Sequence, residues 1–127
     1  IAVTLFGRRV SPRFDAAPQM LIVEEEEQRQ AQQEVIDLAQ QSAFQRVQTL
    51  KERGGGVLIC GAIDRESAWF IDKAGIRLYS WITGTADEAL QMFRECRLIS
   101  GLILEGPGKS AQHWRFRGRW GQPFRND

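Results

Sequence analysis

The sequence predicts an α/β domain in which a five-stranded mixed sheet carries helices on both faces, a three-layer arrangement. One basis is a set of short aliphatic runs bounded by Gly or Pro, which are typical of buried strands. The other is the order of the elements, because strands joined by short connections come first and strands that alternate with amphipathic helical segments follow. Short connections require antiparallel pairing, whereas helical connections allow parallel pairing.

Three strands are expected at the start of the chain. Ile1–Phe6 is an apolar run that Gly7 ends, and Gln19–Glu25 is a second run rich in aliphatic residues. Between them, Arg8–Asp15 forms at best a short strand, because Pro12 has no amide hydrogen to donate to a neighbour. The connections are too short for a crossover helix, so these strands pair antiparallel.

One long amphipathic helix is expected from about Gln28 to Arg53, where no Gly or Pro interrupts the chain. Apolar residues recur there at spacings of three and four, which is typical of a helix that buries one face. The apolar positions are Val35, Ile36, Ala39, Ala43, Phe44, Val47 and Leu50. The triplet Gly54-Gly55-Gly56 ends the helix, because glycine readily adopts the left-handed conformation found there.

Two shorter helices are expected in the second half. Asp64 is placed to cap the amino end of a helix over Arg65–Lys73. Thr85 and Glu88 have the spacing of a capping box, which begins a helix over Ala86–Cys96.

Two further strands, Val57–Ile63 and Ile76–Ile82, precede these helices. The first is a continuous apolar run, as expected for a strand buried on both faces. Right-handed crossovers place both strands parallel to Ile1–Phe6, on its far side from the antiparallel strands. This order of strands predicts a ribonuclease H-like topology.

The charge distribution divides the chain into a domain, 1–105, and a basic aromatic tail, 106–127. The domain has 12 Lys and Arg against 15 Asp and Glu, whereas the tail has 5 against 1. No helical or strand period is sustained in the tail, so we expect it to be flexible. Alternating cations and aromatic rings can bind single-stranded nucleic acid, but so few charges would bind weakly. A nucleic-acid partner is therefore not expected.

Composition excludes several other classes. The apolar runs fall far short of the roughly 18 residues that a membrane span needs, and the amino end lacks a signal-peptide pattern. We therefore expect a cytoplasmic protein without a membrane partner. Cys60 and Cys96 are far apart and outside any Cys/His spacing, so neither a disulfide framework nor a zinc site is indicated.

The carboxyl ends of the parallel strands are the expected ligand site, as in other open α/β sheets. Arginines, glycines and two helix N-termini meet there, and such groups favour an anion. The residues expected at this anion site are Gly7, Arg8, Arg9, Arg13, Gly61, Asp64, Arg65, Thr83, Gly84 and Thr85. The alternative is that these are ordinary turn glycines and solvated arginines.

No catalytic constellation is evident. A nuclease of this topology needs several carboxylates around two metal ions, and Ile1–Phe6 contains none, while Asp64 is interpreted as a helix cap. His113 is the only histidine and lies in the tail, which argues against a hydrolytic triad. Cys60 sits in an apolar run and is interpreted as a core residue, with a metal-ligand role as the weaker alternative. We expect a protein that is not an enzyme.

Four segments, in this order over residues 1–104, resemble the dinitrogenase iron-molybdenum cofactor biosynthesis family, the NifX-like domain also found at the end of NifB. They are IAVTLFG, SPRFDAAPQMLIVE, GVLICGAID and AGIRLYSWITGTADEALQMF. The resemblance implies a ribonuclease H-like fold without nuclease activity. It also implies a role related to nitrogen fixation, in which members bind, carry or help to assemble iron-sulfur or iron-molybdenum clusters together with metallocofactor assembly or acceptor proteins.

Cofactor carriers of this family often have His-Phe-Gly where this chain has Arg13-Phe14-Asp15. Arginine does not coordinate iron, and Cys60 is the one thiol expected near the anion site, so we expect transient, electrostatic holding of a cluster. The sequence thus predicts a non-catalytic carrier of a metal cluster or related anion. The alternative is a protein-interaction or regulatory module that has lost cluster binding.

Overall fold

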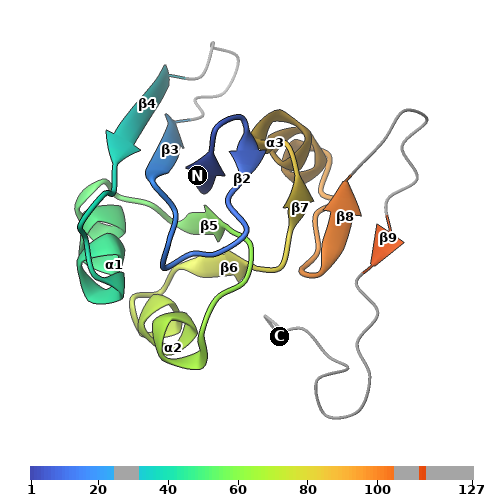
Figure 1. Ribbon diagram of the computed structural model, residues 1–127. Helices are drawn as coiled ribbons and strands as arrows, with labels where there is room; N and C mark the ends of the chain where they lie inside the picture. Colours follow the sequence, from blue (N-terminus) through green and yellow to red (C-terminus); the bar gives the residue numbers. More distant parts are fainter. Residues whose placement is uncertain (25–31, 105–111, 114–127) are drawn as a thin grey trace.

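The computed structural model describes residues 1–24, 32–104 and 112–113 (Figure 1). Within these residues the main sheet has six strands, ordered β4-β3-β1-β5-β6, with β2 paired to β1. The strands are β1 (Ala2–Phe6), β2 (Arg9–Val10), β3 (Gln19–Glu24), β4 (Gln32–Asp37), β5 (Val57–Ile59) and β6 (Arg77–Tyr79). The α/β class and the mixed sheet expected from the sequence are confirmed.

The pairing directions match the expected ones. β1 pairs antiparallel with β2 and β3, and β5 lies parallel to β1 on the other side. β6 continues the parallel part beside β5. The carboxyl ends of β1, β5 and β6 therefore point the same way, which gathers the loops that follow them.

Helices cover both faces of this sheet. The described residues include α1 (Ala43–Glu52), α2 (Arg65–Lys73) and α3 (Ala86–Arg94), with α1 and α2 on one side and α3 on the other (Figure 1). One apolar cluster joins Leu58 to residues of α1 and α2, and a second joins Ile59 to residues of α3. Successive side chains of a strand point to opposite faces, which is why neighbours on β5 serve different cores.

The expectation of one long helix over Gln28–Arg53 is wrong, since residues 32–37 form β4 and residues 28–31 lie outside the described part. β4 pairs antiparallel with the whole of β3, and Val35 is 53% exposed on it. A left-handed residue, Gln40 at φ 68, separates the strand from α1. Ser42 then begins α1 with a capping box to Gln45. The apolar residues of β4 and α1 together follow a helical spacing, and for this reason the sequence predicted a single helix.

The other helices lie close to where they are expected. α2 begins after Asp64 and ends at Lys73, and α3 begins with the capping box between Thr85 and Glu88. α3 ends at Arg94, two residues before the expected Cys96. The expected caps are therefore confirmed.

After β6 the chain leaves the main sheet and starts a second one. It consists of β7 (Thr83–Gly84), β8 (Leu102–Leu104) and β9 (Gln112–His113). β7 and β8 are parallel, and β9 is antiparallel to β8. β9 belongs to the segment expected as a tail without regular structure, and the rest of that segment lies outside the described residues.

Among the described helices, none is both long and apolar enough to cross a membrane.

Candidate functional site

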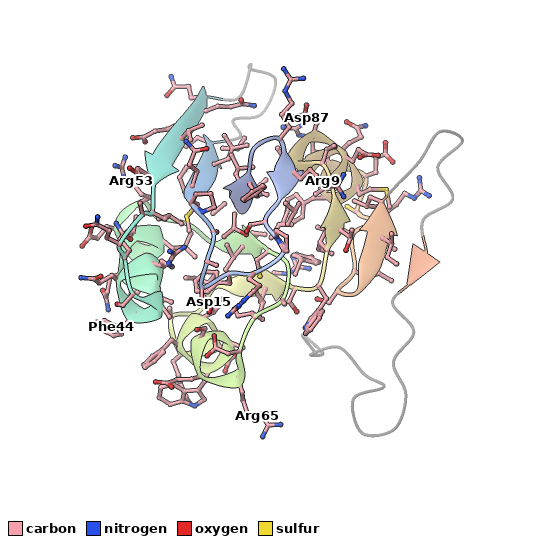
Figure 2. All side chains as sticks on the ribbon, viewed as in Figure 1. Arg9, Asp15, Phe44, Arg53, Arg65 and Asp87 are labelled. Carbon is pink, nitrogen blue, oxygen red and sulfur yellow. The ribbon has the colours of Figure 1, made fainter. Side chains whose placement is uncertain are left out.

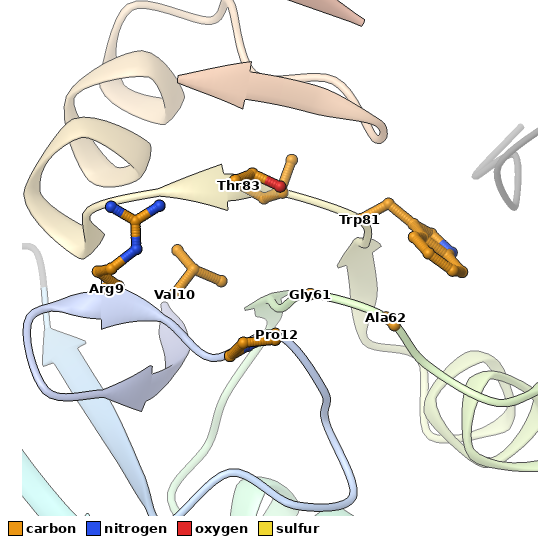
Figure 3. Close-up of a pocket in the computed structure, with 8 residues that line it drawn as sticks. Arg9, Val10, Pro12, Gly61, Ala62, Trp81 and Thr83 are labelled. Atoms are coloured by element: carbon orange, nitrogen blue, oxygen red, sulfur yellow. The ribbon is translucent and has the colours of Figure 1, made fainter. Parts of the chain in front are cut away.

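A cavity of about 290 Å³ lies between β2, the loop after β5 and the segment that leads into β7 (Figure 3). It occupies the end of the sheet where the parallel strands β1 and β5 finish. The lining residues are Arg9, Val10, Pro12, Gly61, Ala62, Trp81, Ile82 and Thr83. The structure thus brings three of the expected site residues, Arg9, Gly61 and Thr83, to one cavity.

One wall of the cavity forms because two loops lie backbone against backbone. The amide of Ala62 donates to the carbonyl oxygen of Pro12 at 2.7 Å, and the amide of Phe14 donates to that of Ala62 at 2.8 Å. Gly61 is required at this contact, since a Cβ there would lie 2.3 Å from the carbonyl oxygen of Ser11. The close approach leaves no room for a side chain at this position.

Arg9 enters the cavity from β2, which rests against the start of α3. The backbone of Arg9 forms a bridge with Thr85, and the amide of Ala86 donates to the carbonyl oxygen of Arg8 at 2.9 Å. Figure 3 shows the Arg9 side chain extending toward β7. The backbone of β2 is therefore held against the first turn of α3, which carries the carboxylates of Asp87 and Glu88.

Trp81 forms the opposite wall, and the sequence did not single it out. Its amide donates to the carbonyl oxygen of Gly61 at 2.9 Å, and the amide of Ile82 donates to that of Cys60 at 3.1 Å. Trp81 has φ 59, which places a bulky residue in the left-handed region. The alternation of residue types along Ile76–Ile82 predicts only that Trp81 lies on one face of a strand. No sequence signal marks a tryptophan with a left-handed backbone.

Gly7, Gly84 and Thr85 lie in or just after strands near the cavity but do not line it. Gly7 turns the chain between β1 and β2 at φ 62. Gly84 lies against β8, where a Cβ would come within 2.6 Å of the carbonyl oxygen of Leu104. The hydroxyl of Thr85 accepts from the amide of Glu88 at 3.1 Å and so caps α3.

Arg13 and Arg65 do not line the cavity. Arg13 forms an ion pair with Asp15 at 2.6 Å, with its side chain 65% exposed. Figure 2 shows Arg65 extending from α2 into solvent. Arg65 adds positive charge near the strand ends, whereas Asp15 offsets the charge of Arg13.

Asp64 is engaged as a helix cap. Its carboxylate accepts from the Ser67 hydroxyl at 2.6 Å and from the Ser67 amide at 3.0 Å. Burial raises the pKa of Asp64, but these hydrogen bonds outweigh it and leave the pKa below its ordinary value. The carboxylate is therefore held ionised by the helix.

Cys60 is fully buried in the apolar cluster beneath α1 and α2. Ile82, which lines the cavity, belongs to the cluster on the opposite face of the sheet. Burial raises the pKa of the Cys60 thiol, so the thiolate that binds metal is disfavoured. Within residues 1–24 and 32–104, no group of three or more His, Cys, Asp or Glu residues could hold a metal ion.

The chemistry of the cavity follows from this lining. Arg9 offers a permanent cation with directed N–H groups, and Thr83 offers a hydroxyl. The remaining side chains are aliphatic or aromatic, and Gly61 presents only backbone. Such a site can hold an anion by charge and hydrogen bonds, without coordinating a metal ion directly.

Comparisons with known proteins point to one family. Residues 1–95 match the family model described as dinitrogenase iron-molybdenum cofactor. No curated protein matches the chain.

Solved structures share the fold. A Thermotoga protein described as a "putative NifB protein" is 28% identical with a TM-score of 0.64, covering 78% of this chain and 90% of that one. The apo form of the orange protein from Desulfovibrio gigas is 26% identical with a TM-score of 0.64, covering 78% and 89%. A Methanocaldococcus jannaschii protein described as a "putative dinitrogenase" is 20% identical with a TM-score of 0.65, covering 76% of this chain and 88% of that one.

Proposed function

Because the chain belongs to the dinitrogenase iron-molybdenum cofactor family over residues 1–95, we propose that it carries a metal-sulfur cluster, of the iron-sulfur or iron-molybdenum type, during cofactor assembly. The cluster is cargo that the protein binds transiently and passes to an acceptor protein of the assembly route. The protein itself acts in the cytoplasm and catalyses no reaction. The topology we assign to it is that of ribonuclease H without the nuclease centre.

The observation that carries this proposal is the position of Arg9 on the wall of a 290 Å³ cavity at the carboxyl end of the parallel strands. Metal-sulfur clusters are bulky anions, and a guanidinium group stabilises an anion by charge-assisted hydrogen bonds. We assign Arg9, Gly61 and Thr83 to direct contact. Gly7, Arg8, Gly84 and Thr85 shape the site through the backbone.

Arg13, Asp64 and Arg65 have a different place in the proposal. Arg65 attracts an approaching anion over a longer range, an effect that salt screens, whereas Asp15 offsets the charge of Arg13. Asp64 keeps the start of α2 in place through Ser67. Cys60 has no direct part, because a ligand in the cavity would lie on the other face of the sheet from the buried thiol.

A second candidate is an interaction module that no longer binds a cluster. The ion pair that engages Arg13 and the burial of Cys60 favour it, since neither group is offered to a ligand. The two candidates differ in one measurable property, which is the uptake of a cluster or of its soluble analogues.

The test is anaerobic reconstitution with ferrous iron and sulfide, and separately with tetrathiomolybdate, followed by gel filtration, metal analysis and visible absorption spectra. We expect chromophore to elute with the protein and to be released by salt. Arg9→Ala should weaken binding about 10-fold to 100-fold, the range for a hydrogen bond to a charged group. Arg65→Ala is the matched control and should change binding far less.

Cys60→Ser separates electrostatic holding from thiolate ligation. The proposal expects the variant to keep the wild-type spectrum and affinity. Loss of the chromophore in Cys60→Ser, with Arg9→Ala unchanged, would contradict the cavity as the site. Protein without bound chromophore under every condition would favour the interaction module.

A further inference from the structure

The outer edge of β4, the edge that faces away from β3, ends the main sheet on the side opposite β6. Figure 1 shows β4 at one margin of the molecule, and among the described strands only β3 pairs with it. An exposed strand edge is a template for pairing with another chain. We infer that two copies of this chain pair antiparallel through the outer edge of β4, with Val35 opposite the Val35 of the second copy. This inference is independent of the carrier function, because β3 separates β4 from the strands beside the cavity.

The first argument is the direction of the backbone groups of β4. Alternate residues of an antiparallel strand direct their N–H and C=O groups to opposite sides. The amide of Leu38 donates to the carbonyl oxygen of Pro18 at 2.9 Å, in the same register that pairs β4 with β3. The even-numbered residues of β4 continue this alternation and bond to β3. The backbone groups of Gln33, Val35 and Asp37 therefore point to the outer edge.

The second argument is that this edge is complementary to itself in one register. With Val35 opposite Val35, Gln33 lies opposite the Asp37 of the second copy, and residues facing in this way exchange backbone hydrogen bonds. The Gln33 amide can also donate to the Asp37 carboxylate. A shift of two residues in one direction sets Glu34 against Glu34, and like charges directly opposite are destabilising. The shift in the other direction sets the Asp37 carboxylate against Val35.

The third argument is the exposure and charge of the side chains on β4. Val35 is 53% exposed, and its partner on β3, Leu21, belongs to the apolar cluster beside α3. Pairing of two copies covers the two valines against each other on that face, and removing apolar surface from water favours association. On the other face Arg53 forms an ion pair with Glu34 at 2.6 Å. This pair offsets the carboxylate charge that two copies bring together.

The first test measures self-association by sedimentation equilibrium over a broad range of concentration. The average mass of the wild-type chain should rise with concentration from that of one chain toward that of two. Val35→Lys sets two cations opposite each other at the centre of the contact and should weaken dimerisation at least about 10-fold. Ile99→Lys is the matched control, because Ile99 is also about half exposed, at 48%, but lies between α3 and β8. Circular dichroism verifies that both variants are folded.

A disulfide tests the register, in chains that also carry Cys96→Ser. Val35→Cys places two thiols at facing positions, with Cα atoms about 5.5 Å apart, a separation that a disulfide spans. Added diamide accepts the protons and electrons that the two thiols lose. We expect a covalent dimer on a non-reducing gel. Gln33→Cys is the matched control on the same edge, because its two copies are offset by four residues, about 13 Å, and should not crosslink.

The outcomes are decisive for the pairing. A wild-type chain that stays monomeric at every concentration overturns the inference, and any occupant of the outer edge would then have to come from a different protein. Self-association that Val35→Lys does not weaken, or that Ile99→Lys weakens equally, places the contact elsewhere and overturns it as well. Crosslinking of Gln33→Cys in preference to Val35→Cys contradicts the register.

Discussion

The guanidinium group of Arg46 donates to the carbonyl oxygen of Ala17 over 2.6 Å, and thereby ties α1 to the loop that leads from the cavity wall into β3. The same group donates to the carbonyl oxygens of Phe14 and Leu38, and its Nε donates to that of Gln41. Arg46 is only 4% exposed. Burial lowers its pKa, and the nearby Asp15 charge opposes this. Its carbonyl partners replace the lost water.

Replacing Arg46 tests whether its hydrogen bonds to backbone carbonyl groups stabilise the fold. Arg46→Met should lower the free energy of unfolding by about 2–4 kcal/mol, because several buried carbonyl groups lose their donor. Urea unfolding monitored by circular dichroism gives the value. Arg53→Met is the control, since the Arg53 ion pair with Glu34 is about half exposed and should contribute about 1 kcal/mol or less. Equal losses of unfolding free energy in the two variants would contradict a stabilising role for the buried Arg46 hydrogen bonds.

Gly61 should tolerate no side chain. In Gly61→Ala the new methyl group would overlap the carbonyl oxygens of Ser11 and Pro12, at 2.3 and 2.5 Å. We expect a loss of about 1–3 kcal/mol in unfolding free energy, as for overpacked sites, and weaker tetrathiomolybdate binding. Gly56→Ala is the control, because nothing lies within 4 Å of a Cβ there. An unchanged stability of Gly61→Ala would mean that the two loops separate easily.

Asp64 should make the stability depend on acidic pH. Folding lowers its pKa, so the folded chain binds this proton less readily than the unfolded chain, and the stabilisation present at neutral pH is lost as the pH falls below the ordinary value of 3.8. Asp64→Ala should cost ~1 kcal/mol at pH 7, as for other helix caps, and progressively less in acid. Thermal melts from pH 7 to pH 2.5 measure the difference. A constant difference would exclude the carboxylate as its source.

The sequence predicted the parts of the fold that local chemistry determines. Apolar runs located β1 and β3, crossover handedness placed β5 and β6, and side-chain caps located α2. The prediction for residues 32–53 was wrong because the turn before α1 contains no Gly or Pro to mark it. The capping-box residues Ser42 and Gln45 carried the missing signal, since a helix that begins at Ala43 leaves β4 to pair with β3.

The sequence predicted where in the fold the candidate site lies, at the carboxyl ends of the parallel strands. It did not predict which side chains line a cavity there. Sheet topology alone brought Arg9, Gly61 and Thr83 together at the strand ends. It could not reveal that Arg13 is occupied by Asp15, because that depends on a loop conformation. Trp81 escaped prediction for a similar reason, since its contribution depends on a left-handed backbone that sequence alternation does not report.

The segment after residue 105 can be tested by truncation. A chain ending at Glu105 loses β9, but β8 keeps its parallel partner β7. We therefore expect the Tm to fall by only a few degrees, the change that corresponds to about 1 kcal/mol in a domain of this size. Differential scanning calorimetry of the two chains compares them directly. A much larger fall would show that the segment contributes to the core of the domain.

The two cysteines should differ sharply in reactivity. Cys96 is exposed, whereas Cys60 is fully buried and burial raises its pKa, so Cys60 has neither access nor thiolate. Ellman's reagent should modify Cys96 quickly in the native protein and Cys60 only after unfolding, with Cys96→Ser showing the slow phase alone. Because folding raises the pKa of Cys60, ionisation of this thiol favours the unfolded chain above pH 9.0, its ordinary value. Cys60→Ala should therefore lose less stability than the wild-type chain between pH 8 and pH 10. Rapid native labelling of Cys60 would show that the core opens readily and would reinstate this thiol as a candidate metal ligand.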